Sequence, residues 1–134
     1  MNTIKTVPPK ITVKADCGNS PKMQLLKRFN TAFAEDDAAF IMDHVTDDVT
    51  WNVINQEVIQ GKAQFEQAIK EMGTWPVIEL TIHSIITHGK EGAVNGTLTM
   101  ENQQQYAFCD VYQFNNAKGE RIKAMTSYVI EIKE

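Results

Sequence analysis

Cysteine is scarce in this sequence, and long apolar runs are absent. Two cysteines, Cys17 and Cys109, are too few for a disulfide framework in a chain of 134 residues. Apolar runs extend for only a few residues, as at Ile85-Ile86, whereas a membrane-spanning helix needs about 20. Residues 1–14 also lack the apolar segment of a secretory signal. We therefore expect a cytoplasmic protein that does not associate with a membrane.

Positive charge and several catalytic motifs are also lacking. The 13 Lys and Arg residues are outnumbered by 17 Asp and Glu, so no basic field is available for phosphates and nucleic acid is not an expected partner. There is neither a glycine-rich phosphate loop nor a Gly-x-Ser-x-Gly nucleophile elbow. His44, His83 and His88 do not have the spacing that places metal ligands on one helical face. We expect no metal and no cofactor.

What remains is the composition of one ordinary globular domain. Hydrophobic residues make up 43% of the chain and charged residues 22%, which excludes a disordered or fibrous protein. Residues 1–19 show little amphipathic pattern and are interpreted as an N-terminal arm, within which residues 11–13 have the composition of an edge strand. Residues 20–134 are interpreted as the domain.

Three helices are predicted in the first half of the domain. The first begins at Ser20-Pro21, with serine as the cap and proline at the first helical position, and has an apolar stripe at helical period. A short second helix, capped by Asp37, follows from Ala38 to about His44, and a third begins at Gly61 and stops at Gly73. Residues 46–48 are predicted as a turn, residues 49–54 as a strand and residues 58–59 as its short partner.

The second half of the chain is predicted to be strand. Four segments rich in β-branched or alternating apolar residues span 77–87, 93–100, 105–114 and 121–132. The turns between them are short, which favours an antiparallel meander. Helices gathered on one face of such a sheet make an α+β domain.

The segment 105–114 carries the most informative chemistry. Period two places Asp110 on one strand face among the aromatic residues Tyr106, Phe108, Tyr112 and Phe114. If that face is covered, the carboxylate loses hydration and its pKa rises, and a protonated acid in an apolar cavity can donate a hydrogen bond to a developing oxyanion. Alternatively, the aromatic face is core or a dimer contact, and Asp110 binds a backbone amide.

Four passages together resemble a nuclear transport factor 2-like domain of the SnoaL-like or ketosteroid isomerase-like type. They are FNTAFAEDD at 29–37, VTDDVTW at 45–51, GKAQF at 61–65 and FCDVYQF at 108–114, and the resemblance covers about residues 20–132. It implies a cystatin-like roll, in which a cone-shaped curved antiparallel sheet wraps around the three helices and encloses a pocket for hydrophobic small molecules. Such domains often dimerise through the sheet.

The resemblance also allows the ketosteroid isomerase groups to be checked one by one. Asp110 corresponds to the oxyanion-donating acid of these relatives. The oxyanion-donating tyrosine corresponds to Phe29, which has no hydroxyl, and the proton-shuttling carboxylate corresponds to Val53. Steroid isomerisation by that mechanism is therefore excluded, while Asp110 alone can still serve as an acid or a base.

The expected ligand-binding residues surround Asp110, the candidate catalytic residue. If strand parity holds without bulges, the pocket face of the sheet carries polar and apolar side chains from two further strands, and the helices and first strand supply apolar walls. These residues are Phe29, Phe33, Trp51, Val53, Asn95, Thr97, Tyr112, Met125 and Ser127.

Three function classes follow from these residues. The first is binding of a hydrophobic small molecule in the cone pocket, with its chemistry undefined. The second is a cofactor-independent acid–base enzyme, namely an isomerase, cyclase or dehydratase that uses Asp110. The third is a non-catalytic dimerisation or adaptor domain. A homodimer through the sheet is expected because Val94, Leu98, Met100 and Val111 would otherwise expose an apolar patch.

Overall fold

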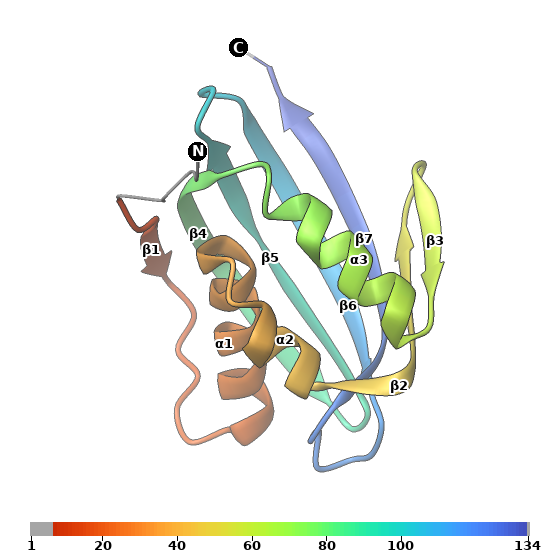
Figure 1. The fold of residues 1–134 in the computed structure, drawn as a ribbon. Helices are drawn as coiled ribbons and strands as arrows, with labels where there is room; N and C mark the ends of the chain where they lie inside the picture. The colour runs from red at the N-terminus through yellow and green to blue at the C-terminus, as the bar shows by residue number, and fades with distance from the viewer. Residues whose placement is uncertain (1–6, 134) are drawn as a thin grey trace.

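The computed structural model describes residues 7–133, so the first six residues of the predicted arm lie outside the described part of the chain. Three helices and seven strands follow one another in the predicted order (Figure 1). The elements are β1 (Lys10–Val13), α1 (Pro21–Glu35), α2 (Ala38–Asp43), β2 (Val45–Val53), β3 (Glu57–Gln60), α3 (Lys62–Met72), β4 (Val77–His88), β5 (Glu91–Met100), β6 (Gln105–Phe114) and β7 (Ile122–Ile132).

One curved sheet contains all seven strands in the order β1-β4-β5-β6-β7-β2-β3. The predicted antiparallel meander is confirmed from β4 to β7, and its short turns are the reason, because they leave no room for a crossover. Two joins are parallel instead, β1 with β4 and β2 with β7, so the sheet is mostly antiparallel. The three helices cover one face, called here the inner face (Figure 1).

Helix α1 begins as its sequence predicts. The Ser20 hydroxyl accepts a hydrogen bond from the Met23 amide, and Pro21 occupies the first helical position, where no amide bond is lost. Leu26 and Phe29 from its apolar stripe are fully buried against the sheet. The helix ends at Glu35, and the next residue, Asp36, caps it, because its left-handed backbone (φ 59°) lets its amide return to the carbonyl groups of the last turn.

The segment between α1 and β2 contains one correction. As predicted, Asp37 caps α2 by accepting from the Phe40 amide, and it also binds the Arg28 guanidinium at 2.8 Å. That hydrogen bond from Arg28 lowers the pKa of the Asp37 carboxyl below its ordinary value. The predicted turn at residues 46–48 is instead part of β2, which starts at Val45. The register with β7 is irregular there, so the two aspartates of this stretch stay exposed within the strand.

The sheet curves because its long strands contain irregularities and small residues. The pairing of β4 with β5 slips at Ile78 and again at His83, and each slip inserts an extra residue that increases the local twist. Gly96 lies beside the second slip, and a Cβ atom there would meet the Thr81 carbonyl oxygen and lie 3.0 Å from the Phe108 ring. Glycine is therefore required at this position, because a side chain would clash with the backbone of β4 and with the Phe108 ring of β6.

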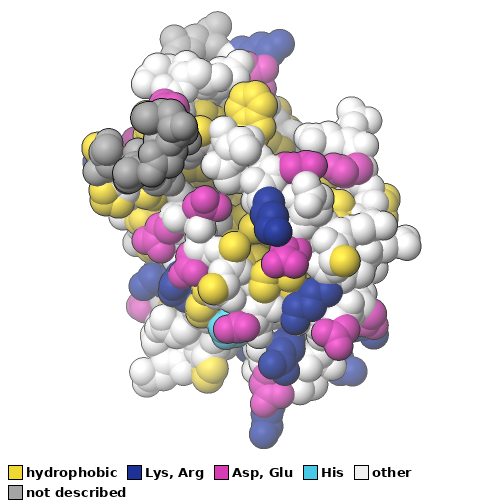
Figure 2. Space-filling model, viewed as in Figure 1, with side chains coloured by type: hydrophobic (Ala, Val, Ile, Leu, Met, Phe, Trp, Pro, Cys, Tyr) yellow, Lys and Arg dark blue, Asp and Glu magenta, His cyan; other side chains and the backbone are white. Residues whose placement is uncertain are grey.

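The core lies between the inner face and the helices, with Tyr112, Phe29 and Phe65 among the largest fully buried side chains. On the helix-covered side, acidic and basic side chains are interspersed and apolar atoms show only in small groups between them (Figure 2). Within residues 7–133, no helix has both the length and the apolar character to cross a membrane.

Candidate functional site

Asp110 lies in the middle of β6 on the inner face of the sheet. It pairs with Val94 of β5 and Ser127 of β7, and residues directly opposite each other in an antiparallel pair point to the same face. Tyr112 is two residues further along and therefore points the same way. A carboxyl group is thus directed at the helices from the centre of the sheet, and Asp110 as a residue is half-buried.

Two hydrogen-bonded arms converge on this carboxyl group. On one side, the Asn30 amide donates to the Tyr112 hydroxyl at 3.0 Å, and that hydroxyl donates to Oδ2 of Asp110 at 3.3 Å. On the other side, the Trp51 indole donates to the Ser127 hydroxyl at 2.8 Å, and Ser127 lies directly opposite Asp110 in the β6–β7 pair, where hydrogen bonding by its hydroxyl lowers the pKa of that carboxyl group. We call these five residues the Asp110 cluster. It joins α1, β2, β6 and β7.

Burial dominates the electrostatics of the cluster. It raises the pKa of Asp110 from 3.8 to about 6, because the ionised form loses hydration that the Ser127 and Tyr112 hydroxyls only partly replace. Burial and the nearby Asp110 charge also hold the pKa of Tyr112 well above its ordinary value. At pH 7.5 Asp110 is therefore mostly an anion and Tyr112 is a neutral hydrogen-bond donor.

Aromatic rings from the helices and β2 form an apolar wall next to the cluster. Phe29 meets Tyr112 edge to face at 6.1 Å between ring centroids, and Phe33 meets Phe29 at 5.2 Å. Phe33 also meets Trp51 at 5.8 Å, and Trp51 meets Phe65 of α3 at 5.6 Å. This continuous run of rings keeps the local environment apolar and so maintains the raised pKa of the carboxyl group.

Most of the predicted site residues lie on the inner side. Met125 and Ser127 share the face of Asp110 through the register of β6 with β7, and Phe33 and Val53 are half-buried beside the core. Phe29, Trp51 and Tyr112 are buried.

Asn95 and Thr97 are not on the Asp110 face, and their predicted position is wrong. They pair with Cys109 and Ala107, which alternate with Asp110 along β6 and therefore point to the opposite, outer face. The β5–β6 register sets this placement, because a change of one residue in register moves every side chain to the other face.

Asn30 is the participant that the sequence patterns did not indicate. It is one of only two polar residues, with Ser127, that are buried within residues 7–133. Asn30 lies four residues after Leu26, inside the apolar stripe of α1. This position could have indicated its role, because a polar residue buried on a helix face needs a hydrogen-bond partner. Phe65, which the sequence indicated as one of the side chains that fill the cone, closes the aromatic wall through its contact with Trp51.

Comparison with known proteins places the chain in a family. The sequence profile of the SnoaL-like domain matches residues 26–125, which is most of the chain. The chain belongs to the SnoaL-like domain family. No curated protein is significantly similar to it in sequence.

Solved structures similar to this SnoaL-like domain share the fold of the NTF2-like superfamily. An NTF2-like protein of unknown function from Cytophaga hutchinsonii is 24% identical, with a TM-score of 0.60, over 81% of this chain and 99% of that one. An LEH-like epoxide hydrolase from M. tuberculosis is 18% identical, with a TM-score of 0.69, over 81% and 82%. The epoxide hydrolase/cyclase-like enzyme SalBIII, named for pyran ring formation in the polyether salinomycin, is 17% identical, with a TM-score of 0.69, over 81% and 90%. These likenesses show the fold.

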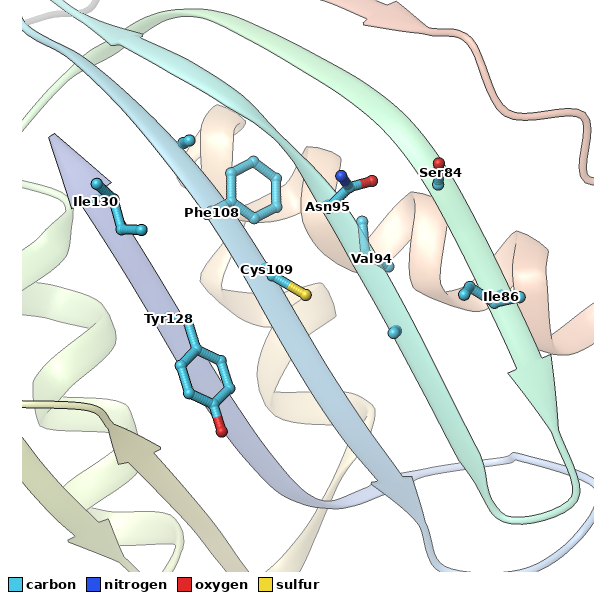
Figure 3. A pocket seen from close by; sticks show the side chains of 10 residues that line it. Ser84, Ile86, Val94, Asn95, Phe108, Cys109, Tyr128 and Ile130 are labelled. Carbon is cyan, nitrogen blue, oxygen red and sulfur yellow. The ribbon is translucent and has the colours of Figure 1, made fainter. Parts of the chain in front are cut away.

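The SnoaL-like domain also has a hollow on the outer face of its sheet. It measures about 430 Å³ and is open to solvent, and Figure 3 shows Asn95, Cys109 and Tyr128 across its floor, with the helices behind the sheet. A second hollow of about 630 Å³ lies between the start of α1 and the β6–β7 turn. Asp110 lines neither of them. Among residues 7–133, no three His, Cys, Asp or Glu side chains are grouped as metal ligands would be.

The patch predicted for a dimer contact is also corrected by the register. Val94 is fully buried on the inner face, and Leu98 and Met100 share its parity along β5. Only Val111 of that set points outward. The apolar side chains exposed on the outer face are Val111 together with Ile86, Tyr128, Ile130 and Ile132.

Proposed function

We propose that this SnoaL-like domain binds an apolar small molecule on the inner side of its sheet, with the Asp110 carboxyl group contacting the polar group of that molecule. The observation that carries the proposal is a carboxyl group directed at the helices beside an aromatic wall, with its pKa raised by burial to about 6. An acid whose pKa is raised by apolar surroundings destabilises the fold when it ionises, and such acids are typical of functional sites.

Further support comes from the residual exposure of the site. Asp110, Phe33 and Val53 are each only partly buried, although all three lie on or beside the inner face, so this is where a ligand would reach the carboxyl group. Two structural relatives carry names that refer to reactions of small organic molecules, an epoxide hydrolase and a cyclase-like enzyme. The proposal of a small organic ligand for this chain is consistent with the names of both relatives.

Binding of paired naphthalene probes tests the proposal. At pH 7.5 we expect the wild-type protein to bind 2-naphthol about tenfold more tightly than 2-methylnaphthalene, because a hydroxyl group can donate to the Asp110 anion and a methyl group cannot. Asp110→Asn should reduce this preference to within about threefold. Isothermal titration gives the affinities, and amide chemical shifts of β6 and β7 locate the probe.

Asn95→Ala is the matched control for this experiment, because Asn95 lines the outer hollow on the neighbouring strand. It should leave both affinities unchanged if the probes bind on the inner side. Absence of saturable binding on the inner side of the wild-type protein would contradict the proposal and favour the adaptor class.

Acid–base catalysis is the second candidate, and the same pKa favours it. A carboxyl group with a pKa of about 6 exchanges protons readily near neutral pH, and at pH 7.5 it is available as a general base. Phe29 and Val53 supply neither a hydroxyl group nor a carboxylate, so the ketosteroid isomerase set of groups is incomplete. On any substrate that is found, Asp110→Asn should lower kcat by about 10²- to 10⁴-fold, and a loss of less than about threefold would remove Asp110 from catalysis.

We also propose a homodimer formed by the outer face of β4–β7. The side chains that line the outer hollow are uncharged, and Ile86 and Ile130 near its ends are 66% and 69% exposed. An uncharged apolar face complements a second copy of itself, as a two-fold contact requires, whereas a face of one charge sign would repel its copy.

Sedimentation velocity tests the dimer. At 50 µM we expect a mass of about twice the 15.1 kDa of one chain. Ile130→Glu should shift the protein to monomer, because each copy would then bury an unpaired charge in the contact. Met72→Glu, on α3 in the opposite layer, is the control and should remain dimeric. A wild-type monomer at this concentration would contradict the proposal.

A further inference from the structure

The two arms of the Asp110 cluster have a defined hydrogen-bond direction. The Trp51 indole nitrogen can only donate, so the Ser127 hydroxyl must accept from it. The Asn30 amide nitrogen is identified as the donor by its second bond, at 2.8 Å to the Leu26 carbonyl oxygen, which can only accept. Each arm therefore begins with a group that only donates.

This direction determines where the hydroxyl protons point. Because Tyr112 and Ser127 each accept from a fixed donor, each keeps its own proton for Asp110. Hydrogen bonds arranged in this order polarise one another, so that the hydroxyl groups become stronger donors. Both arms therefore favour the ionised carboxylate and oppose the desolvation that raises its pKa.

We propose that Asn30 and Trp51 are positioning residues that orient the Tyr112 and Ser127 hydroxyl protons toward Asp110, and that the site consequently selects ligands that present a hydrogen-bond donor to the carboxylate. The ligand preference rests on the proposed function, whereas the positioning role of Asn30 and Trp51 concerns the Asp110 cluster alone. Within the described residues, the ionisable groups coupled to Asp110 are Tyr112 and the adjacent Cys109 thiol, and burial and the Asp110 charge raise the pKa of both, so both are neutral between pH 5 and pH 7.5. Asn30 and Phe29 come from α1, Trp51 from β2 and Phe65 from α3, and among the members of the cluster only Tyr112 and Asp110 ionise.

The positioning role can be tested without a ligand through the two tryptophans of the chain. If the Trp51 arm is coupled to the carboxylate, the ¹⁵N–¹H signal of its indole should shift between pH 5 and pH 7.5 with the same midpoint as the Asp110 carboxyl carbon. Trp75 is 67% exposed, and its indole signal is the internal control, which should stay constant through this midpoint.

Ser127→Ala should abolish the response of the Trp51 indole, because it removes the hydroxyl group that links the indole to the carboxylate. The Asp110 carbon signal, assigned by its loss in Asp110→Asn, gives the reference midpoint. A Trp51 signal that does not titrate in the wild-type protein would overturn this arm of the proposal, and that result does not depend on any variant folding.

A double-mutant cycle tests the other arm. Tyr112→Phe removes one donor and should raise the Asp110 midpoint from about 6 to about 7, since a hydrogen bond to a charged group is lost. Asn30→Leu should move the midpoint in the same direction by a smaller amount. In the Tyr112→Phe background, Asn30→Leu should have no further effect on the midpoint, because Asn30 acts through that hydroxyl. Equal effects of Asn30→Leu in both backgrounds would indicate a merely structural role.

The ligand preference is tested with 2-naphthol and 2-acetylnaphthalene, of which the second can only accept. At pH 7.5 we expect naphthol to bind about tenfold more tightly, and at pH 5, where Asp110 is protonated and can donate, the ketone should gain at least about fivefold in affinity. The pH at which the ketone gains affinity should rise in Tyr112→Phe together with the carboxyl midpoint.

The two proposals fail in different ways. If the midpoints move as expected and neither naphthalene probe binds on the inner side, the proposed function is wrong and the positioning role stands. If the probes bind there while the Trp51 signal and the Asp110 midpoint do not respond, the positioning role is wrong and the binding site stands. Equal affinities for naphthol and the ketone at both pH values would overturn the donor preference.

Discussion

Replacing Asp110 with asparagine should stabilise the folded protein at pH 7.5. The pKa of Asp110 is about 6 in the folded chain, where the group is buried, and 3.8 when it is exposed to water, as in the unfolded chain. The folded state therefore binds the proton more tightly than the unfolded state. Proton binding by Asp110 therefore contributes its full share to the free energy of unfolding below about pH 3.8, and this contribution is lost as the pH rises through about 6. Above that pH, the ionised carboxylate costs about 3 kcal/mol of folding free energy.

Urea unfolding of both proteins at pH 4 and pH 7.5 measures this effect. Relative to the wild type, the free energy of unfolding of Asp110→Asn should be about 2 kcal/mol more favourable to the variant at pH 7.5 than at pH 4. Asn95→Ala on the outer face should show no such pH-dependent difference. If the difference between Asp110→Asn and wild type is the same at both pH values, the carboxyl group is not held in a desolvated site, and the proposed function loses its main support.

Gly96→Ala should destabilise the fold by about 3 kcal/mol. The new methyl group would overlap the carbonyl oxygen of Thr81 on the neighbouring strand and press on the Phe108 ring. A backbone oxygen within a paired strand cannot move without disturbing its ladder, so the cost should reach the upper part of the range for overpacking. The strain would act at the second slip of β4 against β5, where the sheet curves.

Thermal and urea unfolding both measure the effect of Gly96→Ala, and Thr97→Ala is the matched control because Thr97 is the next residue on the same strand and points outward. The control should change stability by less than about 0.5 kcal/mol. A loss of less than about 1 kcal/mol in Gly96→Ala would mean that the strands separate easily at this point, and the requirement for glycine would be wrong.

The order and type of the elements could be predicted because their signals are local. The cap at Ser20-Pro21, the apolar stripe of α1 and the alternation of β6 each depend on residues within one or two turns or one strand. The boundary at residues 46–48 was missed, because two adjacent aspartates favour a turn locally, while the pairing of Val45 with Ile122 of β7 starts the strand before them. The family resemblance rested on the same local passages.

Which side chains share a face with Asp110 could not be determined in the same way. Alternation within one strand is local, so the grouping of Asp110 with Tyr112 was predictable from the residues themselves. The placement of Asn95, Thr97 and Val94 depends on the register between β5 and β6, which runs without a slip and is set by the turn that joins the two strands.

By itself, the sequence of this SnoaL-like domain determined an α+β fold and a carboxyl group among aromatic residues on one strand face. The tertiary structure decided that this face is the covered one, that its burial raises the pKa of Asp110, and which donors meet the carboxylate. Those donors come from distant parts of the chain: Asn30 reaches Tyr112 across 82 residues and Trp51 reaches Ser127 across 76. No local pattern encodes such contacts, because they form only when packing brings α1 and β2 against the sheet.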